Sequence, residues 1–151
     1  MAKYDPIPLA DHIIRAVSWT RLRKDENENV LGCLWQAFEL RDGERYLSTT
    51  WREHFNSDLV QIIAAMRRCG MKLTSKSGLA HANVGKVVEC GNRFGAKLRV
   101  LHQPMPENTG YVAVQNLPHE DHELLEMLAV DAVVETVMVG TIESTNSTSA
   151  Q

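Results

Sequence analysis

The chain has few aromatic residues, few cysteines and no long apolar run. Aromatic residues make up 6% of its 151 residues. No stretch approaches the ~18 consecutive apolar residues that a membrane-spanning helix needs. The N-terminal residues lack a basic stretch followed by an uninterrupted apolar core, so we expect no signal peptide. These absences predict a cytoplasmic protein that does not enter a membrane.

Cysteine is too sparse and too widely spaced to build a disulfide framework or a structural zinc site. Cys33, Cys69 and Cys90 are odd in number and form no CxxC pair. We expect reduced, buried thiols and no metal or other cofactor. A phosphate-binding P-loop is also excluded. Reading back from Gly85-Lys86, the required glycine is Ala80, and Val87 replaces the Ser or Thr that should follow the lysine.

Positive charge is absent after Arg99, and this asymmetry is the clearest functional signal in a chain of net charge −3. Residues 67–99 contain eight cations and one anion, or 8 − 1 = +7, whereas the residues after Arg99 contain eight anions. The eight cations are Arg67, Arg68, Lys72, Lys76, Lys86, Arg93, Lys97 and Arg99.

Two interpretations of this charge pattern remain open. The acidic C-terminal part could lie against the basic segment and cancel its field, each exposed ion pair contributing about 0–1 kcal/mol. Alternatively, the basic segment faces outward and binds a nucleic acid, a nucleotide or an acidic protein. Phe94 is the only aromatic residue in the segment, which disfavours base stacking. Our leading hypothesis is a binding or accessory module that recognises an anionic or protein partner.

Periodicity predicts a single α+β domain over residues 1–139, with helices packed on a mainly antiparallel sheet of about four strands. We expect helices over residues 11–19, 58–69, 84–94 and 119–137. Strands are expected over residues 30–40, 46–51, 98–102 and 111–117, the first two forming a hairpin. Residues 20–29 and 72–83 are expected to be loops, and residues 140–151 a disordered tail.

Histidine supplies an alternative, enzymatic hypothesis. His102 ends an expected strand where a loop begins, and imidazole suits proton transfer near neutral pH. With Arg99, His81 and Asn108 positioning an anion, His102 could act as acid or base on a nucleic acid or nucleotide. The simpler interpretation is a hydrogen-bonded structural histidine.

Two further interpretations remain open. His119 and His122 are spaced for a weak surface metal site, although acidic residues beside them also suit a helix N-terminus. The apolar stripe of the expected C-terminal helix could mediate homo-oligomerisation.

The segment AFELRDGERYLSTTWREHF, residues 37–55, resembles a segment of small uncharacterised bacterial proteins. The segments HANVGK, VLHQPMPENTGYVAVQNLP and LLEMLAVDAV are similar to theirs as well. The resemblance implies a bacterial or mobile-element origin. It carries no activity that could be assigned to residues of this chain.

Overall fold

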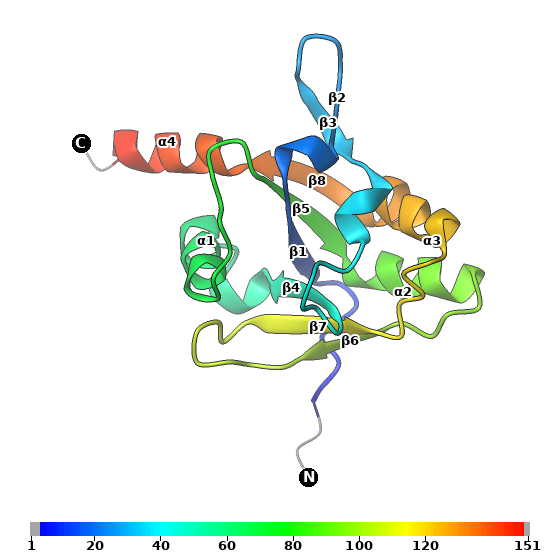
Figure 1. The fold of residues 1–151 in the computed structure, drawn as a ribbon. Helices are drawn as coiled ribbons and strands as arrows, with labels where there is room; N and C mark the ends of the chain where they lie inside the picture. Colours follow the sequence, from blue (N-terminus) through cyan, green and yellow to red (C-terminus); the bar gives the residue numbers. More distant parts are fainter. Residues whose placement is uncertain (1–3, 150–151) are drawn as a thin grey trace.

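The protein folds as an α+β domain around a six-stranded antiparallel sheet with strand order β6-β7-β4-β1-β5-β8 (Figure 1). The computed structural model describes residues 4–149, and side chains up to residue 145. The expected fold class is confirmed, with six strands in the main sheet instead of about four. These strands are β1 (His12–Val17), β4 (Leu47–Trp51), β5 (Gly78–Asn83), β6 (Arg99–His102), β7 (Tyr111–Gln115) and β8 (Val133–Met138).

A separate hairpin and four α-helices complete the fold. The hairpin consists of β2 (Leu22–Lys24) and β3 (Val30–Cys33). The helices are α1 (Leu59–Arg68), α2 (Val84–Arg93), α3 (His122–Met127) and α4 (Val139–Ser149). Short 3-10 turns cover Trp19–Arg21, Trp35–Phe38 and Glu53–Phe55, and a π-helical turn covers Leu128–Ala132.

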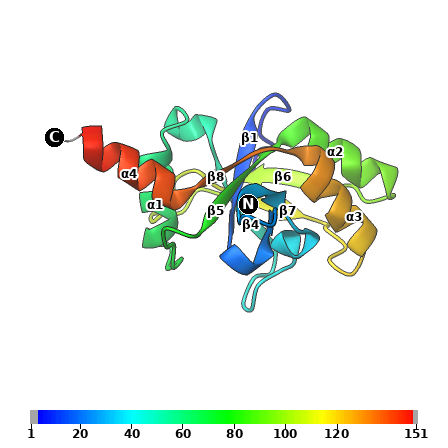
Figure 2. The same cartoon turned by 90° about the horizontal axis from the view of Figure 1, so that it is seen from above.

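Apolar side chains pack on both faces of the sheet. In β1, Ile13 and Val17 belong to a large cluster that includes residues of α2 and α3, whereas Ile14 packs with residues of α1 and α4. Figure 2 shows these two pairs of helices at opposite ends of the molecule. Because alternate strand residues point to opposite faces, β1 is buried on both sides.

The prediction of a helix over residues 11–19 is wrong, because this segment forms the central strand β1. Its side chains at positions 13, 14 and 17 fit one helical face, but they also fit a strand that is buried on both faces. β1 pairs with β5 from His12–Asn83 to Val17–Gly78. The pairing with β5 therefore determines the structure of this segment.

The prediction of a hairpin between residues 30–40 and 46–51 is also wrong. β3 ends at Cys33, and a 3-10 turn follows at Trp35–Phe38. β3 pairs with β2, within the segment 20–29 that was expected to be a loop, whereas β4 pairs with β1 and β7. The expected strand at residues 46–51 is confirmed, but its expected partner is not.

Half of the expected loop at residues 72–83 is the buried strand β5. Glycine and alanine lower its intrinsic strand propensity, yet it pairs with β1 on one side and β8 on the other. Gly78 lies so close to the hairpin that an added Cβ would be 2.7 Å from Leu22 Cδ2. Close packing thus favours the small residues that made this segment look like a loop.

The C-terminal third departs most from expectation. The helix expected over residues 119–137 ends at Met127, and β8 and α4 follow the π-helical turn. The predicted tail is therefore helical as far as Ser149, and residues 150–151 lie outside the described part of the chain. The β-branched sequence VVETVM favours a strand.

Four other expected elements are confirmed. α1 begins after its cap Asp58, whose carboxylate accepts hydrogen bonds from the amides of Val60 and Gln61. α2 follows Asn83, which caps it through Lys86 N. β6 and β7 form the expected antiparallel pair, from Arg99–Gln115 to His102–Val112. Within residues 4–149, no helix has the length and apolar character to cross a membrane.

Candidate functional site

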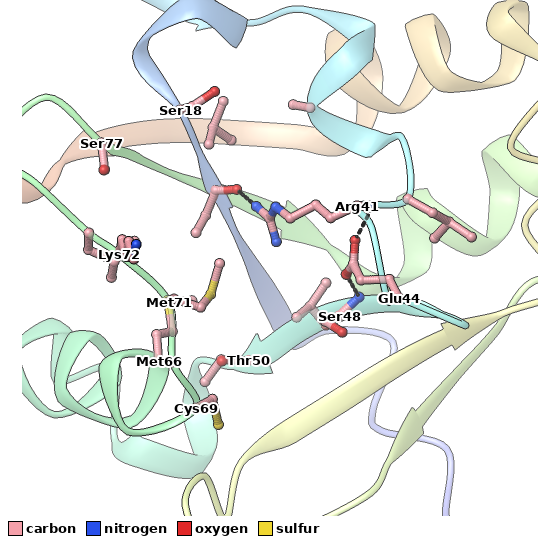
Figure 3. Close-up of a pocket in the computed structure, with 18 of the residues that line it drawn as sticks. Ser18, Arg41, Glu44, Ser48, Thr50, Met66, Cys69, Met71, Lys72 and Ser77 are labelled. Atoms are coloured by element: carbon pink, nitrogen blue, oxygen red, sulfur yellow. Dashed lines mark hydrogen bonds between the residues drawn. The ribbon is translucent and has the colours of Figure 1, made fainter.

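The candidate site is a cavity where β1 and β4 separate. These strands pair only at Ile13–Trp51 and Ile14–Thr50, whereas β1 pairs with β5 along its whole length. Beyond the two pairs lies a cavity of about 950 Å³, here called the β1–β4 cavity. It is lined by residues of β1 and β4, by Met66 of α1, by Tyr111 of β7 and by residues within 18–21, 37–44, 69–77 and 105–108 (Figure 3).

Two arginines satisfy the strand carbonyls that this separation leaves without a strand partner. Arg15 Nη1 donates to Ser48 O at 3.0 Å, and a guanidinium nitrogen of Arg41 donates to Ala16 O. Arg15 also donates to Ala37 O and Glu39 O at 3.0 and 2.8 Å. Arginine side chains therefore replace the missing strand partner at these two carbonyls.

Glu44 forms an ion pair with Arg15. Its carboxylate accepts from Arg15 at 2.7 and 3.1 Å and from Ser48 N at 3.0 Å. Burial alone would raise the pKa of Glu44, but the bonds from Arg15, its charge and the amides of Arg41 and Ser48 lower that pKa to about 2. The charges of Arg15 and Glu44 thus offset each other in an ion pair at one end of the cavity.

Arg21 and Arg41 add further positive charge to the lining of the cavity. Burial, and then the charge of Arg15, lower the pKa of Arg41 to about 10, although Glu44 opposes this effect and Arg21 adds to it. Arg41 remains charged at neutral pH. No carboxylate among the described residues lies within ion-pair distance of Arg21 or Arg41. Half-buried cations without a counter-ion attract an anion.

The rest of the lining combines hydroxyl groups with thioethers. Ser48 Oγ lies 2.8 Å from Tyr111 Oη, and Thr50 Oγ1 accepts from Asn108 Nδ2 at 2.9 Å. Three methionine side chains also line the cavity, and such side chains adapt readily to the shape of a ligand. They are Met66, Met71 and Met105. The cavity therefore offers polar groups, cations and a deformable apolar wall.

Cys69 also lines the cavity as an exposed thiol. Partial burial and the nearby charge of Glu107 raise the pKa of this thiol, although Arg68 acts in the opposite direction. The thiol is therefore protonated at neutral pH. Because the thiolate is the nucleophile, this environment does not activate Cys69 for covalent catalysis.

Of the predicted binding residues, only Lys72 and Asn108 line the β1–β4 cavity. Asn108 is buried, and its Oδ1 accepts from Gly110 N at 3.0 Å, which shapes the loop around it. Lys72 is exposed and contributes a third cation. Sequence reasoning missed Arg21 and Arg41. Arg41 lies in the turn RDGE, which predicted only a change of chain direction, and no local pattern places Arg21 near it.

The other predicted cations are dispersed over the molecule. Arg67 pairs with Glu143 of α4 at 2.7 Å, and Arg93 lies 3.5 Å from Asp131, so part of the acidic C-terminal third does lie against the basic segment. Arg68 Nε donates to Glu107 O, and Lys76 lies over the ring of Trp19. Lys86 lines a second pocket beside α2, and Arg99 is exposed on β6.

His102, predicted as acid or base, and His81, predicted to position the anion, lie far apart. His102 is on β6 and His81 on β5, with β7, β4 and β1 between them, or roughly 19 Å at the usual spacing of strands. His102 Nε2 donates to Thr109 O at 2.7 Å, and its ring lies 5.5 Å from that of His54. Burial, and then the charge of His102, lower the pKa of His54. His102 therefore helps to hold the 103–110 loop.

His81 belongs to a network of titratable groups that the sequence did not reveal, here called the Arg52 cluster. Arg52 lies 3.2 Å from His81 Nδ1, 2.8 Å from His12 Nδ1 and 3.4 Å from Glu135 Oε1. Glu53 accepts from His12 N at 2.7 Å. His81 is 2% exposed, and burial is the main reason that its pKa falls to about 4. Among the described residues, its Nε2 has no hydrogen-bond partner.

The spacing of His119 and His122 does not produce a metal site in the described structure. His122 stacks on Trp35 with ring centroids 4.1 Å apart, whereas His119 Nε2 lies 3.9 Å from a carboxylate oxygen of Glu120. Nowhere within the described residues do three His, Cys, Asp or Glu side chains form a group that could hold a metal ion.

Comparisons with known proteins add no relative from which a function could be transferred. No protein-family model matches the chain, and no curated protein or solved structure matches it either.

Proposed function

We propose that this protein binds a small anionic molecule in the β1–β4 cavity. The observation that carries the proposal is the pair Arg21 and Arg41, which line the cavity without a carboxylate partner among the described residues. Lys72 adds a third positive charge. The proposal retains the expected anionic partner but moves its binding site away from the dispersed cations of residues 67–99.

The dimensions and lining of the cavity favour a molecule with two chemically different ends. A volume of about 950 Å³ lies within the usual range for ligand pockets, roughly 300–1,000 Å³. A phosphate or carboxylate group would interact with Arg21 and Arg41, as guanidinium groups bind such anions with directed hydrogen bonds. The remaining body of the ligand would contact the methionines and hydroxyl groups. A nucleotide or a sugar phosphate has this composition.

The proposal is tested by isothermal titration calorimetry with inorganic phosphate, AMP, ATP and citrate as probes. We expect at least one probe to bind, and Lys72→Glu to weaken that binding about 10-fold, equivalent to ~1.4 kcal/mol. Raising the salt concentration should weaken binding as well, since the attraction is electrostatic.

Lys97→Glu is the matched control for Lys72→Glu. It makes the same change in charge at an exposed residue that does not line the cavity. We expect its affinity to stay within about twofold of the original protein, a change of ~0.4 kcal/mol. Absence of binding for all four probes, or equal losses in the two variants, would overturn the proposal.

A further inference from the structure

One wall of the β1–β4 cavity is the segment that joins α1 to β5, here called the 70–77 loop. It supplies the cation Lys72, and its other lining residues are Gly70, Met71, Leu73 and Ser77. The loop contains neither a helix nor a strand. Its position therefore depends on contacts with the elements around it.

The start of α4 makes direct contact with this loop. Val139 N donates to Ser77 O at 2.9 Å, and Gly140 N donates to Ser75 O at 3.1 Å. The packing is close, since a Cβ added at Gly140 would lie 2.7 Å from Ser75 O and 3.0 Å from Ser75 Cβ. Figure 1 shows the loop passing the start of α4 before it enters β5. α4 thus holds the half of the loop that is nearer to β5.

Arg67, in the last turn of α1, joins α4 to the other half of the loop. Its Nη2 donates to Leu73 O at 2.9 Å and lies 2.7 Å from Glu143 Oε1 of α4. Because one nitrogen contacts both groups, the carboxylate holds the guanidinium where Leu73 requires it. Lys72 precedes Leu73, so the same contact positions the backbone that carries a cation of the cavity.

The sequence of α4 makes it a weak helix on its own. Six of its eleven residues are serine or threonine, which favour a helix less than alanine does, and an isolated helix of this length is marginal in water. Val139 and Ile142 pack in the apolar cluster shared with α1, and the side chains of Arg67 and Glu143 are 42% and 45% exposed. The far end of α4 extends past α1 (Figure 1, Figure 2). α4 therefore needs its contacts with α1 and the loop to stay folded.

We propose that the docking of α4 on α1 and the 70–77 loop regulates anion binding in the β1–β4 cavity, with Arg67 as the positioning residue between them. This inference rests on the proposed function, because it concerns the same site. No described residue of α4 lines the cavity, so α4 acts through the loop. When α4 undocks, Arg67 loses its carboxylate partner and the segment that carries Lys72 is released. The apparent Kd then rises in inverse proportion to the docked fraction.

Hydrogen exchange tests this coupling in the unmodified protein. A ligand that binds only while α4 is docked must stabilise the docked state by the same factor. The amides of residues 143–145 should therefore exchange about 10-fold more slowly with the ligand at ten times its Kd. The probe is whichever of inorganic phosphate, AMP, ATP and citrate binds most tightly. Since these residues do not line the cavity, direct contact with the probe does not explain such protection.

Ile142→Ser combined with Glu143→Gln weakens the docking of α4 without changing the cavity lining. If these losses leave about one molecule in five docked, the Kd of the probe in titration calorimetry rises about 5-fold. Loss of a negative charge would by itself strengthen the binding of an anion, so the direction of the change separates loop positioning from general electrostatics. The matched control is Val130→Ser with Asp131→Asn, beside the second pocket. Its affinity should stay within about twofold of the original.

Gly140→Ala tests the direct contact between α4 and the loop. The added Cβ separates Gly140 from Ser75, although alanine favours the helix itself. We expect the Kd of the same probe to rise about 5-fold. Thr141→Ala is the control, because it raises helix propensity at the exposed neighbouring position and should not weaken binding.

The outcomes separate this inference from the proposed function. If the unmodified protein binds none of the four probes, both are overturned. If it binds a probe but exchange in α4 does not slow, or if the Ile142–Glu143 variant binds as tightly as its control, the role of α4 is wrong and the anion site stands. If that variant does not fold, exchange in the unmodified protein and the Gly140→Ala titration decide.

Discussion

Arg15 and Glu44 form a two-point ion pair in the gap between β1 and β4, with nitrogen–oxygen distances of 2.7 and 3.1 Å. The side chain of Arg15 is 1% exposed and that of Glu44 is 11% exposed. Because the pair also binds three backbone carbonyls and two backbone amides, it joins β1 to both ends of the segment that leads into β4. Its integrity should therefore control the stability of the whole cavity.

Replacing Glu44 by Gln should lower the free energy of unfolding by about 3–5 kcal/mol, because it leaves the buried charge of Arg15 without a partner. Urea unfolding at pH 7 measures this change. Glu26→Gln, at an exposed position, should change stability by less than ~0.5 kcal/mol. An equally small decrease in the free energy of unfolding of Glu44→Gln would show that the Arg15–Glu44 pair contributes little to stability.

Acid should destabilise the protein as His81 becomes protonated. The unfolded chain binds this proton below pH ~6.5, but the folded protein binds it only near the lowered pKa of about 4. Stability is therefore fully present above pH 6.5 and falls as the pH is lowered toward 4, by up to ~3 kcal/mol. Arg52 and His12 favour the neutral form, whereas Glu135 and Glu53 oppose it.

Urea unfolding at several pH values between 7 and 4 tests this dependence. His81→Gln removes the titrating group and retains an acceptor for Arg52, so its stability should fall less steeply over the same interval. His119→Gln, at a surface histidine, should keep the steep dependence of the original protein. Equal slopes for all three proteins would contradict the assignment to His81.

Asn108→Ala should destabilise the protein by about 1–3 kcal/mol and weaken binding in the cavity. The change leaves Thr50 Oγ1 and Gly110 N without the side chain that bonds to both. Differential scanning calorimetry measures the first effect, and titration with the anion that binds best measures the second. Asn92→Ala, at an exposed position in α2, is the control and should leave binding unchanged.

Gly91→Ala should destabilise α2 although alanine is the better helix former by ~1 kcal/mol. An added Cβ would lie 2.7 Å from Ala96 O and 2.6 Å from Leu98 Cγ, so that either the helix or the following turn must move. We expect a net loss of about 1–2 kcal/mol in urea unfolding, since the cost of overpacking exceeds the gain in propensity. Greater stability of the variant would show that the turn after α2 moves at little cost in free energy.

Sequence predicted those elements whose signals are local. α1 combines an apolar stripe with the cap Asp58, and β6 and β7 flank a loop that contains Pro104 and Gly110. In contrast, β5 contains Gly78, which packs closely against Leu22. Such a segment becomes a strand only because β1 and β8 pair with it. No window of sequence around β5 contains that information.

The candidate site was less predictable than the fold because its charges are balanced over long distances in sequence. Arg15 lies in the segment 11–19 that was expected to be a helix, but in the structure it is buried and pairs with Glu44, 29 positions away. Lys72 could be identified from the excess of cations in its segment. Arg41 could not, because only the separation of β1 and β4 places it at a cavity.

The position of β1 has a consequence for synthesis of the protein. β1 is made early, but its partner β4 begins at Leu47 and its other partner β5 begins at Gly78. At about 5–20 residues per second, a nascent chain carries this apolar strand for several seconds before β5 exists. Delayed closure of the central sheet makes the emerging chain a substrate for chaperones that bind extended apolar segments, and it makes slow translation before Asn83 a risk for aggregation.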